Sequence, residues 1–332
     1  MQAVVISEFG GPDVLRLASL PDPEPSPREI LVRVRASGVN RADLLQRRGL
    51  YPPPPGESEV PGLEFAGVVE EVGVGVTRWQ PGDRVMGIVG GGGYAERVAV
   101  DERVAVAVPE GMPWSMAGAI PEVYMTAFDA VFRQAGLQRG ETLLIHAVGS
   151  GVGTAAVQLA RRAGAHTIGT SRTAFKLQRA AEIGLDVGLD GGDAWARTVM
   201  NETDGFGADV ILDLVGAPYL ARNQAAIAMG GRHVVVGVPG GSRAEIDLRA
   251  LMARRARLFG TVLRVRGVEE KAELAGEFSA EVVPGFPDGW LLPVIDRVFP
   301  VSRAAEAHRR MEANENFGKI VMVWGAEGWG GG

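Results

Sequence analysis

The chain contains no cysteine. This absence excludes disulfide bonds, thiolate catalysis and every zinc site that requires Cys ligands. Histidine is also scarce, since His146, His166, His233 and His308 are the only four, and none has a partner at metal-ligand spacing. We expect each of them at the surface or at a strand end, and we predict no metal site.

The sequence also lacks long apolar runs and an excess of positive charge. No stretch reaches the about 20 apolar residues that a membrane-spanning helix needs. The N-terminal segment MQAVVISEFGG has neither the basic start nor the long apolar run of a signal peptide. We therefore expect a cytoplasmic protein with no membrane partner. The net charge of −6 argues against a general nucleic-acid-binding surface.

Glycine, in contrast, is abundant, with 47 of the 332 residues, about twice ordinary usage. Such a content indicates many tight turns and close backbone approaches. The length is sufficient for two domains of ordinary size.

The pattern of apolar and turn-forming residues changes near Met116. Before it, short apolar runs such as EILVRVRA and EFAGVVEEVG are broken by Gly and Pro, which predicts a β-rich, barrel-like region. A short helix is expected over Arg41–Arg48, stopped by the prolines Pro52 to Pro55. The Gly-rich tail from Gly325 to Gly332 is predicted to be disordered.

From Glu141 onward, apolar strands alternate with helices. The predicted strands are TLLIHA, HTIGT, DVGLD, ADVILDLV, RHVVVGV and RLFGTVL. This alternation indicates βαβ units and a parallel sheet, and six such strands predict a doubly wound α/β dinucleotide-binding domain. After residue 264, the chain is expected to return to the first domain through PVIDRVFP, a helix over Arg303–Ala313 and the strand KIVMVW.

A glycine-rich turn follows the first of these strands. It reads Ala147-Val148-Gly149-Ser150-Gly151-Val152-Gly153, which departs from the strict G-x-G-x-x-G pattern. Its context is nevertheless that of a phosphate-binding turn, because an apolar strand precedes it and a helix of small residues follows. We expect Gly149, Ser150, Gly151 and Val152 to contact a pyrophosphate at the helix N-terminus.

The end of the second strand predicts which dinucleotide binds. Arg172 lies 19 residues after Gly153, close to the about 20 residues at which the ribose-reading side chain is expected. No acid occurs between His166 and Ala181. Arg172 and Lys176 can attract a 2′-phosphate, and Ser171 and Thr173 can donate hydrogen bonds to it. The sequence therefore favours NADPH as the cofactor.

Several segments together resemble one known family. They are GVNRADLLQRRGLYPPPPG, PGLEFAGVV, AGAIPEVYMTAF, IHAVGSGVGTAAVQLAR, ILDLVG, LLPVIDRVFPV and EAHRRMEANENFGKIV. The chain is similar to the zinc-independent quinone oxidoreductases of the medium-chain dehydrogenase/reductase superfamily, of the p53-inducible type. Zinc-dependent relatives carry Cys near positions 38–39 and His-Glu near 63–64, where this chain has Gly38-Val39 and Leu63-Glu64.

The resemblance implies a GroES-like catalytic domain over 1–120 and 264–332, and a Rossmann NADPH-binding domain over 121–263. It implies an NADPH:quinone oxidoreductase whose partner is a small quinone or related acceptor. It also implies a homodimer in which LFGTVL, the last strand of the nucleotide-binding sheet, pairs with its copy.

The resemblance also implies roles for individual residues. Asn40, Asp43 and Tyr51 are expected on the substrate side. The further expected cofactor-binding residues are Glu122, Thr126, Leu214, Gly216, Gly237, Val238, Thr261, Val262, Leu263, Asn316 and Lys319. Relatives often place a Tyr after the third strand to hold the 2′-phosphate side, whereas this chain has Asp190-Gly191-Gly192-Asp193 there.

Alternatives stay open at this point. Asn40 also suits a helix N-cap, Asp43 and Glu122 could orient loops without moving protons, and Tyr51 could serve only in loop packing. The segment from Asn40 to Tyr51 also resembles that of enoyl-thioester reductases, which reduce an activated C=C bond with NADPH and use the Tyr as a proposed proton donor. A non-enzymatic role is the third class, since some members of the superfamily accumulate as lens crystallins or bind nucleic acid, although the acidic pI near 5.4 argues against the latter.

Overall fold

The computed structural model describes residues 1–325 and divides into two compact units. Unit 1 combines Met1–Met125 with the chain from Leu263 onward, and unit 2 is Thr126–Val262. The disorder predicted for the tail lies outside the described residues, apart from Gly325. Within the described part of the chain, none of the helices is long and apolar enough to cross a bilayer.

Unit 1 is built on a seven-stranded, mostly antiparallel sheet. Its order is β14-β15-β3-β4-β5-β7, and β6 pairs with β3 off this path. A separate hairpin joins β1 to β2. The strands are β1 (Gln2–Ile6), β2 (Leu15–Ser19), β3 (Glu29–Val39), β4 (Glu64–Val72), β5 (Arg84–Ile88), β6 (Arg97–Asp101), β7 (Ala105–Ala107), β14 (Ile295–Pro300) and β15 (Lys319–Val323).

The core of this sheet comes from apolar residues spaced two apart along the strands. Ile30, Val32 and Val34 of β3 are buried with Phe65 and Val69 of β4, as expected for a strand with one face turned inward. The strand β15 then pairs antiparallel with β3. The two ends of the chain therefore share one sheet, which brings residues near 40 and residues near 319 together.

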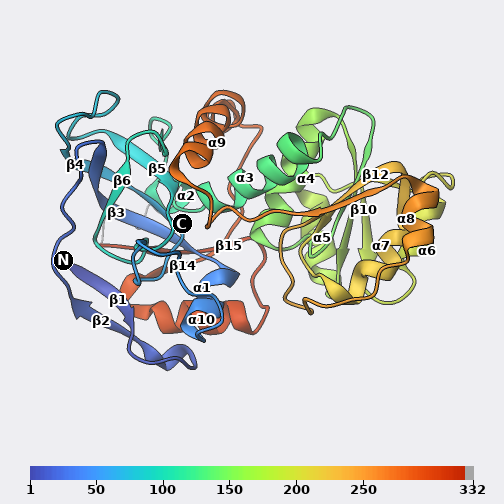
Figure 1. The fold of residues 1–332 in the computed structure, drawn as a ribbon, viewed down its shortest axis with the longest axis horizontal. Helices are drawn as coiled ribbons and strands as arrows, with labels where there is room; N and C mark the ends of the chain where they lie inside the picture. The colour runs from blue at the N-terminus through green and yellow to red at the C-terminus, as the bar shows by residue number, and fades with distance from the viewer. Residues whose placement is uncertain (326–332) are drawn as a thin grey trace. The chain divides into compact units, whose positions relative to one another are not determined.

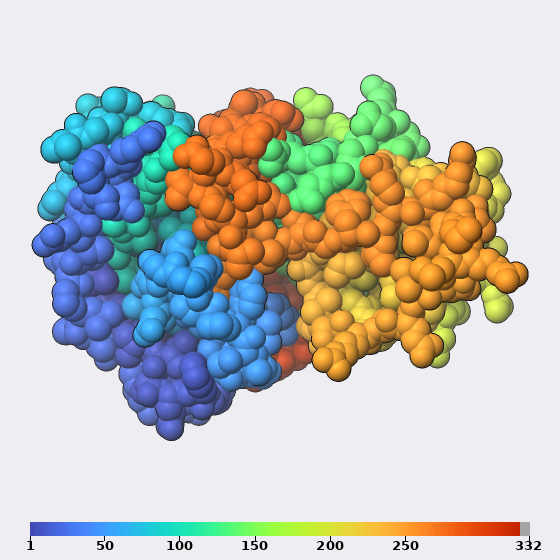
Figure 2. All heavy atoms as spheres, in the orientation of Figure 1, coloured from blue at the N-terminus to red at the C-terminus, as the bar shows by residue number. Residues whose placement is uncertain are grey.

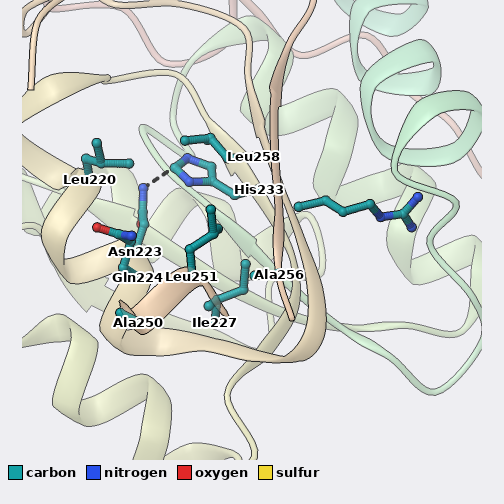
Figure 3. A pocket seen from close by; sticks show the side chains of 10 residues that line it. Leu220, Asn223, Gln224, Ile227, His233, Ala250, Leu251, Ala256 and Leu258 are labelled. Atoms are coloured by element: carbon teal, nitrogen blue, oxygen red, sulfur yellow. Dashed lines mark hydrogen bonds between the residues drawn. The ribbon is translucent and has the colours of Figure 1, made fainter. Parts of the chain in front are cut away.

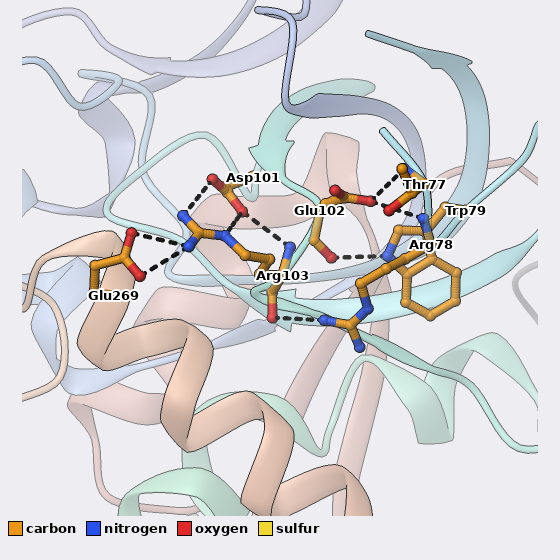
Figure 4. A network of polar contacts seen from close by, with 7 residues as sticks. All are labelled: Thr77, Arg78, Trp79, Asp101, Glu102, Arg103 and Glu269. Carbon is orange, nitrogen blue, oxygen red and sulfur yellow. Dashed lines mark hydrogen bonds and ion pairs between the residues drawn. The ribbon is translucent and has the colours of Figure 1, made fainter. Parts of the chain in front are cut away.

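Five helices accompany this sheet, and one of them is attached to it by an ion-pair network. They are α1 (Arg41–Arg47), α2 (Trp114–Ala117), α3 (Pro121–Phe128), α9 (Val268–Glu281) and α10 (Ala304–Glu312). Arg103, after β6, pairs with Asp101 at 2.9 Å and with Glu269 of α9 at 2.8 Å (Figure 4). The orange atoms of α9 lie beside blue and teal atoms from the first third of the chain (Figure 2). Both α9 and α10 thus belong to the N-terminal unit.

Unit 2 is a six-stranded parallel sheet in the order β10-β9-β8-β11-β12-β13, with helices packed along it (Figure 1). The order reverses between β8 and β11, and right-handed crossovers then place helices on both faces. The predicted doubly wound fold is confirmed. The strands are β8 (Thr142–Ile145), β9 (His166–Ser171), β10 (Val187–Asp190), β11 (Ala208–Asp213), β12 (Ile227–Val235) and β13 (Arg257–Gly260).

The helices of unit 2 follow the strands in the expected alternation. They are α4 (Gly151–Ala163), α5 (Ala174–Glu182), α6 (Trp195–Glu202), α7 (Leu220–Ala226) and α8 (Leu248–Arg254), with a π-helical turn at Asp129–Gln134. Two strand boundaries differ from prediction. β12 begins at Ile227 rather than near Arg232, and β13 ends at Gly260, so Thr261, Val262 and Leu263 lie beyond it.

The prediction for the histidines was wrong in one respect. His146, His233 and His308 are buried, with exposed fractions of 0%, 3% and 0%, and His308 lies inside a helix rather than at a strand end. Each is accommodated because ring nitrogens have polar partners: both in His146 and His308, and Nε2 in His233. His166, at the start of β9, and His146, directly after β8, lie at strand ends as expected, and of these two only His166 is substantially exposed.

Candidate active site

The glycine-rich turn of unit 2 connects β8 to α4. Ser150 occupies the N-cap of α4, and its hydroxyl accepts a hydrogen bond from the Gly153 amide at 3.1 Å. A Cβ at Gly153 would stand 2.6 Å from the Val148 carbonyl oxygen, so only glycine allows the helix to start this close to the turn. The first amides of α4 at Gly151 and Val152 thereby lie at the carboxyl edge of the sheet, where phosphate groups bind.

The four predicted phosphate-holding residues lie at the junction of β9 and α5. Ser171 is buried, and its Oγ accepts a hydrogen bond from the Thr173 amide at 3.2 Å. Arg172 and Thr173 are exposed. A Cβ at Gly149 would lie 2.9 Å from Lys176 Cδ, so the Lys176 stem packs directly on the glycine turn. The structure therefore brings Lys176 and the turn together at one edge of the sheet.

A tyrosine reaches the loop after β10 from another element. Tyr219, in the short 3₁₀ helix Ala217–Tyr219, donates a hydrogen bond to the Gly191 carbonyl at 2.8 Å. The Arg222 guanidinium lies over the Tyr219 ring, 5.5 Å from its centroid. A Cβ at Gly191 would lie 3.4 Å from Arg172 Cγ. The loop that lacks its own Tyr is thus supplied with a phenol close to Arg172.

Two loops at the carboxyl ends of β11 and β12 pack on one another. The Gly240 amide donates to the Val215 carbonyl at 2.9 Å, and the Ala217 amide donates to the Gly241 carbonyl at 2.9 Å. Gly216 has φ +90°, and a Cβ there would stand 2.7 Å from the Gly241 carbonyl oxygen. The predicted residues Leu214 and Gly216 therefore neighbour the loop that carries Gly237 and Val238.

Asp213 holds the first of these loops. Its Oδ1 accepts hydrogen bonds from the amides of Val215 and Gly216, both at 2.8 Å. Its Oδ2 accepts from the Asn223 side chain at 3.1 Å and contacts His233 Nε2 at 3.0 Å. Burial alone would raise the pKa of Asp213, but these hydrogen bonds hold it below its ordinary value. The sequence analysis did not single out Asp213, although an acid that ends an apolar strand was a visible signal.

The polar chain continues to His146. His146 Nε2 lies 2.6 Å from Asn223 Oδ1, and its Nδ1 lies 2.9 Å from Thr170 Oγ1. Burial lowers the pKa of His146 to about 4, so the ring is neutral near pH 7. This network lies inside unit 2 and fixes the loop 214–216 rather than offering a reactive group.

A pocket lies nearby, between α7, α8 and the strands β12 and β13. Leu220, Ile227, Leu251 and Leu258 line it together with Asn223 and His233 (Figure 3). None of the residues predicted to bind the cofactor lines this pocket. The predicted residues Thr126, Thr261 and Val262 lie elsewhere, and the Thr261 hydroxyl accepts a hydrogen bond from Gln134 at 2.6 Å.

In unit 1, Asn40, Glu64 and Lys319 form one buried cluster. Lys319 Nζ pairs with Glu64 Oε1 at 2.6 Å and donates to Asn40 Oδ1 at 2.5 Å. Asn40 Nδ2 donates to Glu64 Oε1 at 2.8 Å. Because the ammonium can only donate, the orientation of the Asn40 amide is fixed. Asn40 also occupies the N-cap position of α1, so its backbone starts the helix while its side chain serves the cluster.

Asp43 is buried at the first turn of α1, and both of its oxygens are engaged. Oδ2 accepts from the Asn40 amide at 2.7 Å and from the Tyr94 hydroxyl at 2.8 Å, and Oδ1 accepts from the Gly62 amide at 3.3 Å. Burial raises the pKa of Asp43 to about 6 in spite of these bonds. Asp43 therefore fixes the start of α1 and the turn at Gly62.

Tyr94 connects Asp43 to a buried histidine and arginine. His308 Nε2 lies 3.2 Å from the Tyr94 hydroxyl, and Arg47 Nη1 lies 3.3 Å from His308 Nδ1. Arg47 can only donate, so Nδ1 accepts, Nε2–H donates to Tyr94, and Tyr94 donates to Asp43. Burial lowers the pKa of His308 to about 3. The chain of contacts ends at Arg47, whose guanidinium does not give up a proton, so the chain holds these side chains in place rather than conducting protons.

Tyr51 lies in the proline-rich loop above Arg264. The Arg264 guanidinium is 5.0 Å from the centroid of the Tyr51 ring and donates to the Tyr51 carbonyl at 3.0 Å. Arg264 also donates to the Gly90 carbonyl at 2.7 Å and to Gln46 Oε1 at 2.6 Å. This buried arginine thus fixes the loop, and it is a second residue that the sequence analysis missed.

Glu122 lies in the first turn of α3, and its backbone amide donates to Glu64 Oε2 at 3.0 Å. Burial raises the pKa of the Glu122 carboxyl to about 8, with a further contribution from the negative charge of Glu64. The predicted residue Leu263 is buried in the same unit. Asn316 is also buried; its amide donates to the Gly318 carbonyl at 2.9 Å, whereas its Oδ1 has no hydrogen-bond partner among residues 1–325.

The zinc chemistry of some dehydrogenases does not fit this cluster. The chain has no Cys, and position 63 is Leu. The Lys319 ammonium lies between Glu64 and Asn40, and a cation at this place repels a second one. Over residues 1–325, no group of three or more His, Cys, Asp or Glu side chains is arranged to hold a metal ion.

A nicotinamide dinucleotide fits the residues of unit 2 better. The glycine turn lets α4 begin close to the sheet, because a Cβ at Gly153 would stand 2.6 Å from the Val148 carbonyl oxygen, and the first amides of α4 lie there. In unit 1, the buried Asn316 Oδ1 is an acceptor that a ligand amide could satisfy.

The chain belongs to the medium-chain dehydrogenase/reductase superfamily. A model described as alcohol dehydrogenase GroES-like domain matches residues 26–110, and one described as zinc-binding dehydrogenase matches residues 151–283. Members bind a nicotinamide cofactor, and the chain is an oxidoreductase of this family. Among curated relatives, the quinone oxidoreductase of Rattus norvegicus is 32% identical over 97% of this chain and 98% of its own length.

Two solved structures are also similar over nearly the whole chain. A mycobacterial protein, Rv1454c, complexed with NADPH, has a TM-score of 0.89 at 30% identity and covers 97% of this chain and 100% of its own. The JamJ enoyl reductase has a TM-score of 0.88 at 26% identity and covers 98% and 99% of the two chains. Relatives named for two different reactions therefore share this fold.

Proposed function

We propose that this chain is an NADPH-dependent quinone oxidoreductase that works without zinc. The observation that carries the proposal is that Lys176 packs on the glycine turn and that exposed Arg172 lies at the same junction of β9 and α5. The chain is also similar to quinone oxidoreductases along nearly its whole length. Arg172, Thr173, Ser171 and Lys176 form a phosphate-binding group, and no acid lies between them to repel a 2′-phosphate.

The cofactor residues divide by role. The turn from Gly149 to Val152 binds the pyrophosphate through amides at the start of α4. Leu214, Gly216, Gly237 and Val238 border the loops that Asp213 fixes. In unit 1, Asn316 offers its unpaired Oδ1 to a carboxamide. When bound, NADPH supplies the hydride.

The substrate residues lie in unit 1. Tyr51, fixed by Arg264, offers an aromatic ring and a hydroxyl to the acceptor. A hydrogen-bonded polar cluster is formed by Asn40, Lys319 and Glu64. Asp43 fixes α1, the helix that begins after Asn40. A quinone needs only a hydride and a proton, so no Lewis acid is required.

The experiment is NADPH oxidation by the purified chain with 1,2-naphthoquinone as acceptor. We expect turnover with this quinone, and tighter binding of NADPH than of NADH. Absence of quinone reduction with bound NADPH would refute the assignment.

A second candidate function is reduction of an activated C=C bond. The similarity to the JamJ enoyl reductase favours it, as does the hydroxyl of Tyr51. The variant Tyr51→Phe separates the two functions. Its rate of NADPH oxidation is compared with that of the parent, with the naphthoquinone and with a crotonyl thioester as acceptors. For a quinone reductase, we expect only a modest change with the quinone and negligible thioester turnover in the parent. The second function is correct instead if the parent turns over the crotonyl thioester much faster than the naphthoquinone and Tyr51→Phe lowers the thioester rate more than about a hundredfold.

We further propose that the chain forms a homodimer through β13. This strand is at one end of the order of the sheet, and it pairs with β12. Apolar side chains on and near this strand are exposed, namely Leu258, Leu248 and Met252. An exposed apolar edge strand favours pairing with another chain. Sedimentation of the parent and of Leu258→Lys tests this, with a dimer expected for the parent alone.

A further inference from the structure

Glu122 is a carboxyl group without a hydrogen-bond partner in a cluster of charges. Its side chain is only partly exposed, at the first turn of α3. Across the described chain no group hydrogen-bonds its carboxyl oxygens, although its backbone amide is bonded to Glu64. A partly buried polar group left open in this way can receive a ligand.

The neighbouring Glu64 differs from Glu122 in burial and in hydrogen bonding. Its carboxylate is fully buried and accepts from Lys319, from the Asn40 amide group and from the Glu122 backbone. These three donors fix the position of the Glu64 carboxylate. The two neighbouring carboxyls therefore differ in their contacts: Glu64 is held by protein donors, whereas the Glu122 carboxyl is open to a ligand.

The charged groups around Glu122 come from several elements. Glu64 on β4 and Asp43 on α1 favour its protonated form, while Lys319 on β15 and Lys271 on α9 oppose it. Tyr51 and Arg264 also interact electrostatically with Glu122. Burial is the largest influence, and its pKa of about 8 makes Glu122 a neutral acid near pH 7.

We propose that Glu122 is the proton donor that completes reduction of the acceptor. The inference rests on the proposed function. A hydride adds two electrons and one proton to the quinone, which leaves a hydroquinone monoanion. The O–H bond of Glu122 breaks as its proton moves to the phenolate-like oxygen, which gives the neutral hydroquinone and the Glu122 carboxylate. Water then returns a proton to Glu122.

The direction of this transfer is favourable. A phenolic hydroxyl has a pKa of about 10, above that of Glu122, so the proton moves downhill. Tyr51 is a poorer donor, because burial raises its pKa above the ordinary value for tyrosine. Asp43 is excluded by geometry, since both of its oxygens accept hydrogen bonds from the protein.

The first test compares Glu122→Gln with the parent, using Glu269→Gln as a matched control. Glu269 is 81% exposed and pairs with Arg103, away from the cluster. In the parent and the control, quinone turnover should fall above pH about 8, as Glu122 loses its proton. In Glu122→Gln, this limb should vanish, and kcat at pH 6.5 should fall about tenfold. The loss lies below the usual 10²–10⁴-fold for an acid, because water can also protonate the anion.

Lys271→Met provides a second variant in case Glu122→Gln does not fold. Lys271 lowers the pKa of Glu122, so its removal should move the falling limb of the profile to higher pH. An unmoved limb in Lys271→Met, or an unchanged profile and kcat in Glu122→Gln, would overturn the inference.

Infrared difference spectroscopy separates this inference from the function. The parent at pH 7 should show a protonated-carboxyl band that Glu122→Gln lacks and that titrates near pH 8. If the parent shows the band, Glu122→Gln lacks it, and the parent does not reduce quinones, then the proposed function is contradicted while Glu122 is still a neutral acid. Turnover in the parent without that band contradicts the role of Glu122 alone.

Discussion

Lys319 and Glu64 form an ion pair of 2.6 Å in which the two side chains are only 3% and 0% exposed. Lys319 begins β15, the last strand in the chain, and Glu64 begins β4. Removing both charges from water is costly, and their attraction and the hydrogen bonds of Asn40 compensate for this only while both partners are present.

The first prediction concerns this pair. Lys319→Met leaves the Glu64 charge buried without its cation, and we expect the free energy of unfolding to fall by about 3–5 kcal/mol. Denaturant unfolding measures it, and the double variant Lys319→Met/Glu64→Gln should recover part of the loss. A single variant as stable as the parent would show that the pair is not formed.

The second prediction concerns Gly38, which lies against this pair. A Cβ built at Gly38 would overlap Lys319 Cε and Glu64 Oε1 and lie 2.9 Å from the Gly118 carbonyl oxygen. Gly38→Ala should therefore destabilise the chain by at least about 1–3 kcal/mol. Gly276→Ala is the control, because Gly276 is inside α9 with no atom within 4 Å of its Cβ position. The control should gain about 0.5–1 kcal/mol; equal effects of the two substitutions would contradict the overlap.

The third prediction concerns cofactor choice. A hydrogen bond to a charged group contributes about 1.5–3 kcal/mol, or roughly ten- to 150-fold in affinity. Arg172→Ala should weaken NADPH by that factor and leave NADH nearly unchanged, as measured by calorimetry or fluorescence titration. Equal dissociation constants for NADH and NADPH in the parent would refute the role of Arg172.

The fourth prediction concerns metal. Because the chain has no thiolate ligands and Lys319 supplies a cation in the buried cluster, turnover should survive dialysis against a strong chelator. Elemental analysis should find well under one zinc per chain. A stoichiometric zinc whose removal abolishes turnover would contradict this expectation.

The fifth prediction concerns the pH dependence of stability. The pKa of Glu122 is about 8 in the folded chain and ordinarily 4.5. Between these values the folded state binds the extra proton, so the contribution of Glu122 to stability falls as pH rises. Glu122→Gln should therefore gain on the parent from pH 4.5 to 8, by at most about 1.4 kcal/mol per pH unit. Thermal unfolding across this range measures the gain, and a constant difference would contradict the raised pKa.

The sequence predicted the elements of the fold better than its polar clusters. Apolar periodicity predicted the parallel sheet of unit 2, because each strand and helix is recognisable locally. It did not predict that Glu64 pairs with Lys319 or that Tyr94 lies between Asp43 and His308. These partners are far apart in sequence and meet only in the folded sheet. The pairing of β15 with β3, for example, brings Lys319 to Glu64. Residue type alone likewise could not distinguish a buried His308 from an exposed one.

The strand β15 also determines the order in which the protein can be completed during synthesis. Unit 2 is continuous, so it can fold while the ribosome is still adding later residues, as domains generally do. Unit 1 must wait for β15, which pairs with β3 across about 280 residues of intervening chain. Until then, Glu64 has no Lys319 to neutralise it. Until β15 is made, the end of β3 from Ala36 to Val39 therefore lacks the partner that later covers it, and an unpaired strand edge of this kind can pair with the wrong strand.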